Sequence, residues 1–363
     1  MHISELDTPA LAIDLDIMER NLTRVADYTR AHGLRLRPHT KTHKIPALGK
    51  RQVELGAAGL TVAKVGEAEV MLASGTPDLL IAYPVIGRRK LERLVKVARE
   101  TRVTVSLDSL YAAKELSDAA QSGGVEFGVL AEVDVGLGRV GVPPAEVLSL
   151  VDSLRWLPKV TFEGIAFYPG HIKEMNNGGG KQLSALNEAV RGMLSCLEKA
   201  GVKANIVSGG STPSLFHSHL VEGLNEIRPG TYIFNDRNTV ATGACGWQDC
   251  AASILVTVVS TAVKDQMIID GGSKTFSSDG LITGADPGFG RVVEAPDAAF
   301  VRMNEEHGYV DMHNSNVRFE IGQRVRMIPN HICAAMNLHE TVYGIRGDQV
   351  EITWKVEGRG KLQ

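Results

Sequence analysis

The chain has 363 residues, of which 44% are hydrophobic and 22% are charged, and its formal net charge is -3. This composition is that of a globular protein and not of a disordered one, and the charge gives no electrostatic reason to expect a nucleic-acid partner. No apolar run reaches the roughly 18 residues of a membrane span, and residues 1–7 lack the features of a signal peptide, so no membrane association is expected.

The first two thirds of the chain alternate short β-branched runs with helical stretches. Residues 11–15 are predicted as a strand, residues 17–32 as a helix that stops at Gly33, and residues 34–37 as a second strand. Further strands are predicted at residues 60–63, 79–82, 103–106, 125–130, 160–166 and 204–207. Such alternation predicts parallel βαβ units, and this many units favour closure into a (β/α)8 barrel over an open sheet.

After about residue 250 the pattern changes to β-rich runs without long helices between them. These runs lie at residues 253–263, 266–270, 324–328 and 349–356. They predict a second, mostly antiparallel domain. Because an α/β barrel takes about 250 residues, we expect the barrel over residues 8–245 and the β-rich domain over residues 246–363, together with residues 1–7.

The cysteines are few and irregularly spaced for a chain of this length. They stand at positions 196, 245, 250 and 333. This pattern argues against a disulfide framework and favours a reduced, cytoplasmic setting.

A lysine follows the predicted strand at residues 34–37. Active sites of (β/α)8 barrels lie at the C-terminal ends of the strands. Alternation along an extended segment would place His39, Lys41 and His43 on one face. A partly desolvated lysine at a barrel mouth loses its proton more easily, which suits a Schiff-base former. A solvated basic loop is the alternative, and the spacing alone does not decide between the two.

Two glycine-containing turns follow late strands of the predicted barrel. Ser208-Gly209-Gly210-Ser211-Thr212 comes directly after Val207, and Arg228-Pro229-Gly230-Thr231-Tyr232 comes shortly afterwards. Backbone N–H groups of such turns can hold a phosphate, and late barrel strands are a common place for one. Each turn by itself is more often only a turn. A third strand-end loop carries Arg139, for which a surface arginine is the alternative.

A histidine and a cysteine stand two residues apart at the end of a strand predicted in the β-rich domain. The side chains of His331 and Cys333 would then point the same way, as two ligands of one ion must. Two protein ligands leave positions open for water and substrate, which is typical of a catalytic metal. Thiolate and imidazole together favour Zn²⁺ over Mn²⁺ or Mg²⁺. The alternative is a buried apolar cysteine beside a hydrogen-bonded histidine.

These motifs, in this order, resemble the fold-type III pyridoxal phosphate enzymes and, within them, the D-threonine aldolase / D-serine dehydratase family. The resemblance extends along nearly the whole chain and includes the opening Asp7-Thr8-Pro9-Ala10 and the Arg37-Pro38-His39-Thr40-Lys41 motif. It implies an alanine-racemase-like barrel, a homodimer, a small amino-acid substrate, and a divalent metal on His331 and Cys333.

The resemblance also implies the roles of individual cofactor residues. Lys41 would be the Schiff-base lysine of pyridoxal 5′-phosphate, with His39 among the cofactor-binding residues. Arg139 would lie near the cofactor O3′, and Tyr168 would lie beside the ring. The phosphate would be held by the turn from Ser208 to Thr212 and by the segment from Gly230 to Tyr232.

The sequence departs from the aldolase pattern at two positions. Cys333 stands where D-threonine aldolases usually carry aspartate and where the dehydratases usually carry cysteine. Pro169 stands where some aldolases place a histidine that helps to deprotonate the substrate hydroxyl. His171, two positions further on, or a metal-bound water could take that role.

We interpret the chain as a lyase that depends on pyridoxal phosphate and a divalent metal and acts on D-β-hydroxy-α-amino acids. The first interpretation is retro-aldol cleavage to glycine and an aldehyde, as by D-threonine aldolase. The alternative is D-serine or D-3-hydroxyaspartate dehydration to a keto acid and ammonia. An amino-acid racemase needs no His-x-Cys pair, and a non-catalytic pyridoxal phosphate carrier resembles a lone barrel, so both are placed lower.

Overall fold

The computed structural model describes residues 1–175, 178–283 and 288–363. In this part of the chain, no helix is both long and apolar enough to cross a membrane.

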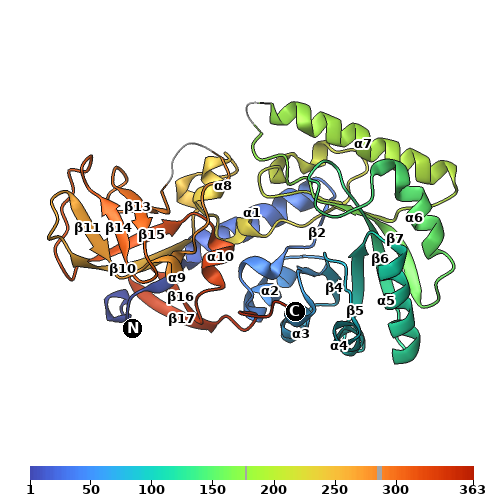
Figure 1. The fold of residues 1–363 in the computed structure, drawn as a ribbon, viewed down its shortest axis with the longest axis horizontal. Helices are drawn as coiled ribbons and strands as arrows, with labels where there is room; N and C mark the ends of the chain where they lie inside the picture. Colours follow the sequence, from blue (N-terminus) through green and yellow to red (C-terminus); the bar gives the residue numbers. More distant parts are fainter. Residues whose placement is uncertain (176–177, 284–287) are drawn as a thin grey trace. The chain divides into compact units, whose positions relative to one another are not determined.

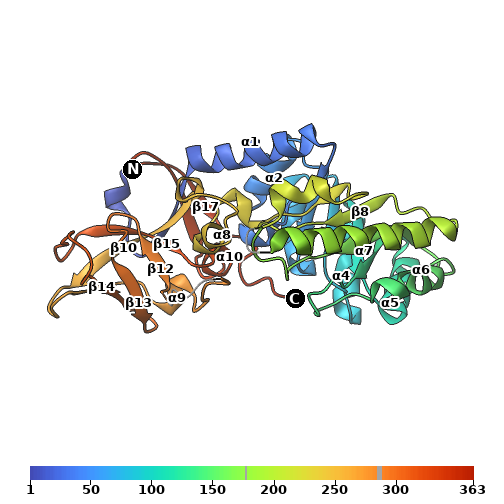
Figure 2. The same cartoon turned by 90° about the horizontal axis from the view of Figure 1, so that it is seen from above.

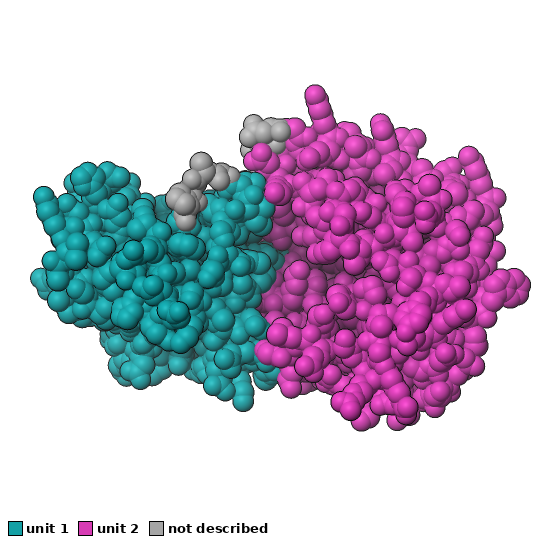
Figure 3. All heavy atoms as spheres, viewed as in Figure 1, with its two compact units in different colours: residues 1–23, 231–359 teal, residues 24–230, 360–363 magenta. Residues whose placement is uncertain are grey.

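The chain forms two compact units, which Figure 3 distinguishes by colour. The barrel unit consists of residues 24–230 and 360–363, and the β-rich unit consists of residues 1–23 and 231–359. The sequence predicted the domain boundary after residue 245, whereas in the structure the chain passes from the barrel unit to the β-rich unit after Gly230.

The barrel unit is built on eight parallel strands (Figure 1). They are β2 (Arg35–Leu36), β3 (Leu60–Val62), β4 (Asp78–Ile81), β5 (Arg102–Leu107), β6 (Phe127–Val133), β7 (Val160–Phe167), β8 (Ile206–Gly209) and β9 (Glu226–Ile227). They pair in the order β2-β9-β8-β7-β6-β5-β4-β3. The two ends of this order also meet, because the Ala58 N–H donates to the Leu36 carbonyl at 2.8 Å and His39 bridges Thr61. The expected (β/α)8 barrel is therefore confirmed.

Helices follow the barrel strands and cover their outer side (Figure 2). They are α2 (Pro46–Glu54), α3 (Val65–Met71), α4 (Arg88–Ala98), α5 (Leu110–Gly123), α6 (Val147–Leu154) and α7 (Gly179–Lys199), while α1 (Leu15–Ala31) contains the change of unit after Thr23. In α5, Ser109 caps the N-terminus by accepting the Ala112 N–H, and Gly124 ends the helix in the left-handed conformation. Leu116 and its neighbours on one face of α5 are buried in the apolar core. Burying the Leu116 side chain contributes about 2 kcal/mol.

The β-rich unit contains a nine-stranded, mostly antiparallel sheet. Its strands are β1 (Ala10–Asp14), β10 (Ala252–Ser260), β11 (Gln266–Ile269), β12 (Gly290–Val292), β13 (Ala299–Met303), β14 (Gly308–Asp311), β15 (Arg324–Pro329), β16 (Thr341–Arg346) and β17 (Gln349–Lys355). The order is β11-β14-β13-β12-β15-β10-β1-β16-β17, and β11 also pairs with β10, so six strands close into a barrel-like ring. Three short helices accompany them: α8 (Arg237–Ala241), α9 (Ser273–Phe276) and α10 (Ile332–Met336).

Two strands differ from the sequence-based expectation. The first strand, β1, was expected among the barrel strands, but it pairs antiparallel with β10 and parallel with β16 in the β-rich unit. The barrel instead takes β9 as its last strand along the chain, which the hydrophobic pattern missed. This strand has two residues, and one of them, Glu226, is a charged residue that is fully buried.

Candidate active site

Lys41 lies directly after β2, at the C-terminal end of a barrel strand, and its side chain is exposed. It belongs to a 3-10 turn, Thr40–Thr42, that is capped by His39, whose ring accepts the Lys41 N–H at 3.4 Å. The expectation that His39, Lys41 and His43 share one face is wrong, because the segment is a turn and the His43 ring is fully buried.

The two histidines beside Lys41 are held in their neutral form. Burial lowers the pKa of His43 to about 4, although its Nδ1 accepts the Ile45 N–H at 3.0 Å and its Nε2 lies 3.3 Å from Oε1 of Gln52. Burial and the positive charges of Lys41 and Arg228 hold the pKa of His39 well below its ordinary value. Lys41 and Arg228 thus place positive charge beside the neutral imidazole of His39.

Arg139 and Tyr168 are brought together, as the resemblance implies. The guanidinium carbon of Arg139 lies 5.2 Å from the centre of the Tyr168 ring, which is a cation–π distance. The loop that carries Arg139 is organised by Asp134, whose carboxylate accepts the backbone N–H groups of residues 136–138. These hydrogen bonds lower the pKa of Asp134, so its carboxylate remains charged and keeps the loop in place.

His171 packs against the same loop. A Cβ atom added to Gly136 would lie 3.3 Å from the His171 ring, so the glycine makes room for the imidazole. The Nδ1 atom of His171 is buried and has no hydrogen-bond partner among the described residues. A buried imidazole nitrogen without a partner is costly unless a ligand uses it. His171 thus packs against the loop that carries Arg139, with a buried nitrogen that no described residue bonds.

The glycines of the predicted phosphate turn are required by their surroundings. Gly210 has a φ of +88°, and a Cβ atom at Gly209 would lie 2.3 Å from the Phe167 ring. The Ser211 hydroxyl lies 3.1 Å from that of Ser214, within the turn, and Thr212 is half-buried. Such a turn, with only hydrogen atoms on two successive α-carbons, leaves the backbone open to a phosphate.

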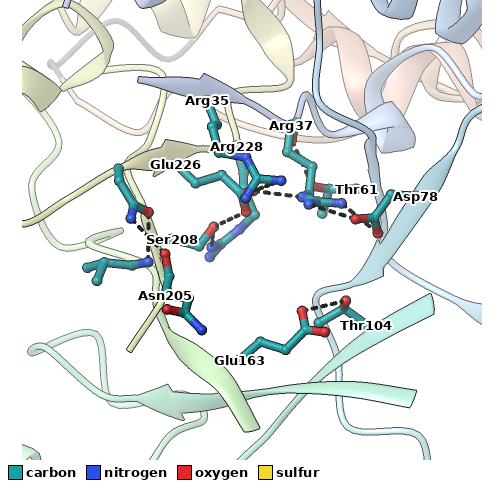
Figure 4. A network of polar contacts seen from close by, with 12 residues as sticks. Arg35, Arg37, Thr61, Asp78, Thr104, Glu163, Asn205, Ser208, Glu226 and Arg228 are labelled. Atoms are coloured by element: carbon teal, nitrogen blue, oxygen red, sulfur yellow. Dashed lines mark hydrogen bonds and ion pairs between the residues drawn. The ribbon is translucent and has the colours of Figure 1, made fainter. Parts of the chain in front are cut away.

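Ser208 points into the barrel and not into the turn. Its hydroxyl donates to Oε1 of Glu226 at 2.8 Å and accepts from Nη1 of Arg228 at 2.5 Å (Figure 4). The same Glu226 accepts from Nε of Arg37 at 2.9 Å, so the interior of the barrel holds a connected polar network. The Ser208 hydroxyl expected to bind a phosphate is therefore engaged in this network.

Arg228 is a site residue that the sequence analysis did not single out. Its buried guanidinium also donates to the Phe167 carbonyl at 3.1 Å. Burial lowers the pKa of Arg228, and the nearby carboxylates of Glu132 and Glu226 oppose that change. The sequence could have pointed to Arg228, because it is the first residue of the second glycine turn. The strand before it was not recognised as a strand, so Arg228 was not placed at a strand end.

The second turn crosses from one unit to the other. Gly230 ends the barrel unit, and a Cβ atom there would lie 2.8 Å from Oγ1 of Thr42. Thr231 and Tyr232 begin the β-rich unit in a 3-10 turn, Thr231–Ile233, in which Tyr232 is buried. Within that unit, Oγ1 of Thr231 lies 3.7 Å from Sγ of Cys333.

His331 and Cys333 lie on a strand-to-helix turn. β15 ends at Pro329, His331 is the N-cap of α10, and Cys333 lies in the first turn of that helix. The predicted strand end is therefore wrong in detail, yet the side chains still meet, because the imidazole hydrogen-bonds to the thiol. Burial opposes the charged imidazole, but Cys333, Asp236 and Asp279 raise the pKa of His331 to about 10.

The donor set of this turn fits a divalent metal. Nδ1 of His331 lies 2.6 Å from Oδ2 of Asp279, which leaves the other ring nitrogen for an ion, as is usual where a carboxylate orients a metal-binding histidine. Imidazole and thiolate suit Zn²⁺. No group of three or more histidine, cysteine or acidic residues is arranged to hold a metal in residues 1–175, 178–283 and 288–363. Two protein ligands would leave positions open for a substrate.

Known proteins share both units. The family "Alanine racemase, N-terminal domain" matches residues 13–238, and "Putative serine dehydratase domain" matches residues 251–345. The chain is 33% identical to a 3-hydroxy-D-aspartate aldolase of Paracoccus denitrificans (strain Pd 1222) over 99% of this chain and 94% of that one. It is 32% identical to a D-threo-3-hydroxyaspartate dehydratase of Delftia sp. (strain HT23), over 96% and 97%. The crystal structure of D-threonine aldolase from Filomicrobium marinum superposes with a TM-score of 0.92 at 30% identity, over 99% and 98%.

Proposed function

Because the chain belongs to the fold-type III pyridoxal phosphate enzymes of the D-threonine aldolase / D-serine dehydratase family, we propose that it is a lyase acting on D-β-hydroxy-α-amino acids. The observation that carries this proposal is the contact between His331 and Cys333, with Asp279 on the second nitrogen of the imidazole. A divalent metal held by His331 and Cys333 would supply a Lewis acid, which suits a substrate with a hydroxyl on the β-carbon.

The cofactor residues proposed from the sequence fit pyridoxal phosphate. Lys41 would hold it through its amine, Arg139 and Tyr168 would contact its ring, and the glycine turns at Gly209 and Gly230 would receive its phosphate through backbone N–H groups. When bound, the cofactor supplies an electron sink for carbanion chemistry. His39, whose pKa burial and the charges of Lys41 and Arg228 hold well below its ordinary value, would be a neutral neighbour of the cofactor.

The metal residues proposed are His331 and Cys333. The thiolate makes Zn²⁺ the favoured ion, with Mn²⁺ and Mg²⁺ as poorer matches. Asp279 holds the imidazole in one orientation, and Thr231 lies against the cysteine sulfur.

The reaction type depends on which proton the chain's own bases remove. If His171 takes the proton of the β-hydroxyl, the Cα–Cβ bond breaks and glycine and an aldehyde result. If Lys41 takes the Cα proton, the hydroxyl leaves and a keto acid and ammonia result after hydrolysis. We propose the aldolase reaction, supported by the buried and unpaired Nδ1 of His171. Cys333 in place of the aldolases' usual aspartate favours the dehydratase as the second candidate.

Product analysis separates these reactions. The enzyme, supplied with pyridoxal phosphate and Zn²⁺, is incubated with D-threonine, D-serine and D-3-hydroxyaspartate, and L-threonine serves as the control. Glycine with an aldehyde supports the aldolase, whereas a 2-keto acid with ammonia identifies the dehydratase. Formation of the L-enantiomer without either product would overturn the lyase and indicate a racemase.

The proposed assembly rests on the resemblance, and the proposed location rests on the cysteine pattern of the sequence. We propose a homodimer in a reduced cytoplasmic setting, and the four cysteines are free thiols in the structure. Light scattering coupled to size exclusion tests the dimer directly.

A further inference from the structure

Two cysteines of the β-rich unit stand at the ends of one tight turn. Cys245 precedes and Cys250 follows the segment from Gly246 to Asp249, which contains a 3-10 turn. The turn is closed by two hydrogen bonds between its ends, from the Gly246 N–H to Oδ2 of Asp249 at 2.9 Å and from the Asp249 N–H to the Gly246 carbonyl at 3.0 Å. The turn brings the two cysteines close enough that each thiol changes the pKa of the other.

The environments of the two thiols differ. Cys250 is 8% exposed, whereas Cys245 is half-buried and more accessible, and its thiol lies 3.4 Å from Oγ1 of Thr239. The hydrogen bond from Cys250 lowers the pKa of Cys245, and the same bond together with burial raises the pKa of Cys250. An accessible thiol that ionises readily, beside a second thiol that keeps its proton, is the arrangement of an attacking and a resolving cysteine.

We propose that Cys245 and Cys250 form a reversible disulfide and are a redox modification site of the β-rich unit. The oxidant is a hydroperoxide. The Cys245 sulfur attacks the peroxide oxygen, the O–O bond breaks, and an alcohol or water leaves while Cys245 becomes a sulfenic acid. The Cys250 sulfur then attacks the Cys245 sulfur, an S–S bond forms, and the sulfenic oxygen leaves as water. Two electrons pass from the thiol pair to the peroxide, and two protons end on its oxygens.

The proposed metal ligands share a scaffold with this cysteine pair. Thr239, the partner of Cys245, forms a capping box with Asp236 at the start of α8. The Asp236 carboxylate accepts the N–H of Thr239 at 2.9 Å with one oxygen and the N–H of Ile332 at 2.9 Å with the other. Ile332 lies between His331 and Cys333 in the sequence. A disulfide removes the thiol hydrogen that Cys245 donates to Oγ1 of Thr239, so oxidation acts on a residue of that scaffold.

Peptide mapping of the full-length protein tests the proposal. The protein is treated with a small excess of hydrogen peroxide, alkylated with iodoacetamide and digested with trypsin. Cleavage after Arg237 and Lys264 gives one peptide that contains Cys245 and Cys250, whereas Cys196 and Cys333 fall on other peptides. We expect this peptide to lack both alkyl groups and two hydrogen atoms, and to regain full alkylation after dithiothreitol.

Variants make the assignment specific. Cys250→Ser should stop the oxidation at the sulfenic acid of Cys245, which dimedone traps, and Cys196→Ser should leave the disulfide unchanged. A wild-type peptide that is alkylated at both positions after peroxide, or that carries sulfinic acid instead of a disulfide, would overturn the proposal. Neither cysteine belongs to the residues proposed for cofactor or metal, so this failure leaves the proposed lyase untouched.

Discussion

Oδ2 of Asp279 lies 2.6 Å from Nδ1 of His331, although 52 positions separate the two residues in the sequence. Asn330 secures this contact from the neighbouring position, since its side-chain amide donates to the Asp279 carbonyl at 2.9 Å and to the Gly288 carbonyl at 2.8 Å. The segment that carries Asp279 is thereby held against the histidine. We expect Asp279→Ala to weaken Zn²⁺ binding by about 10- to 100-fold, because the imidazole loses the partner that sets its orientation.

Competition with a chromophoric zinc chelator measures this affinity without any turnover. Asp348→Ala is the matched control, since Asp348 is an exposed aspartate of the same unit, and its zinc affinity should equal that of the wild type. Equal zinc affinity in Asp279→Ala and the control would show that the carboxylate does not support the ligand.

The anchoring lysine has a direct optical test. Lys41→Ala should abolish both turnover and the visible absorbance of the lysine-bound cofactor, because the amine that holds the cofactor is removed. Lys50→Ala, at an exposed lysine of α2, should keep both. A Lys41→Ala protein that retains the lysine-bound absorbance, with the cofactor found on another lysine by borohydride reduction and peptide mapping, would contradict the assignment.

The proton-transfer role of His171 is tested by its effect on turnover. His171→Gln should lower kcat for aldehyde formation by about 10²- to 10⁴-fold, the usual contribution of a general base, and should leave KM nearly unchanged. His217→Gln is a close control, because the Nδ1 of His217 is likewise buried without a partner among the described residues, on the Leu215–Leu220 turn. If His171→Gln reduced aldehyde formation no more than His217→Gln, the base would have to be sought elsewhere.

Stability should fall in mild acid because of the buried imidazole of His43. Its folded-state pKa of about 4 lies below the ordinary value of 6.5, so the unfolded chain binds the proton more readily between these two values. Stability is therefore lost as the pH falls from 6.5 toward 4, and a shift of this size corresponds to about 3 kcal/mol. Urea unfolding at pH 7.5 and pH 4.5 should show a smaller difference in His43→Gln than in the wild type. The exposed His307→Gln should retain the wild-type difference, and an unchanged difference in His43→Gln would refute the assignment.

The parts of the site that depend on local chain geometry could be predicted from the sequence. Lys41, Arg139 and the glycine turn at Gly209 all follow segments that were predicted as strands, and strand ends of a parallel barrel meet at one edge. The residues missed depend on contacts distant in sequence. Asp279 lies 52 positions from His331, and nothing in the sequence links the two. Arg228 follows a strand of two buried residues, one of which is the charged Glu226. A hydrophobic pattern identifies a buried strand only where the buried side chains are apolar. A strand whose side chains form ion pairs inside the barrel is therefore missed by such a pattern.

The position of β1 sets an order on the assembly of the chain during synthesis. This strand lies between β10 and β16, so both of its hydrogen-bonded neighbours are translated after residues 24–230 of the barrel unit. Contacts this distant in sequence form late and slow folding, because the loop between them must be closed first. On the ribosome the barrel unit can complete its sheet before residues 1–23 pair with their partner strands. Strand β1 is thus made before the barrel segment, yet it is among the last strands to reach its final place.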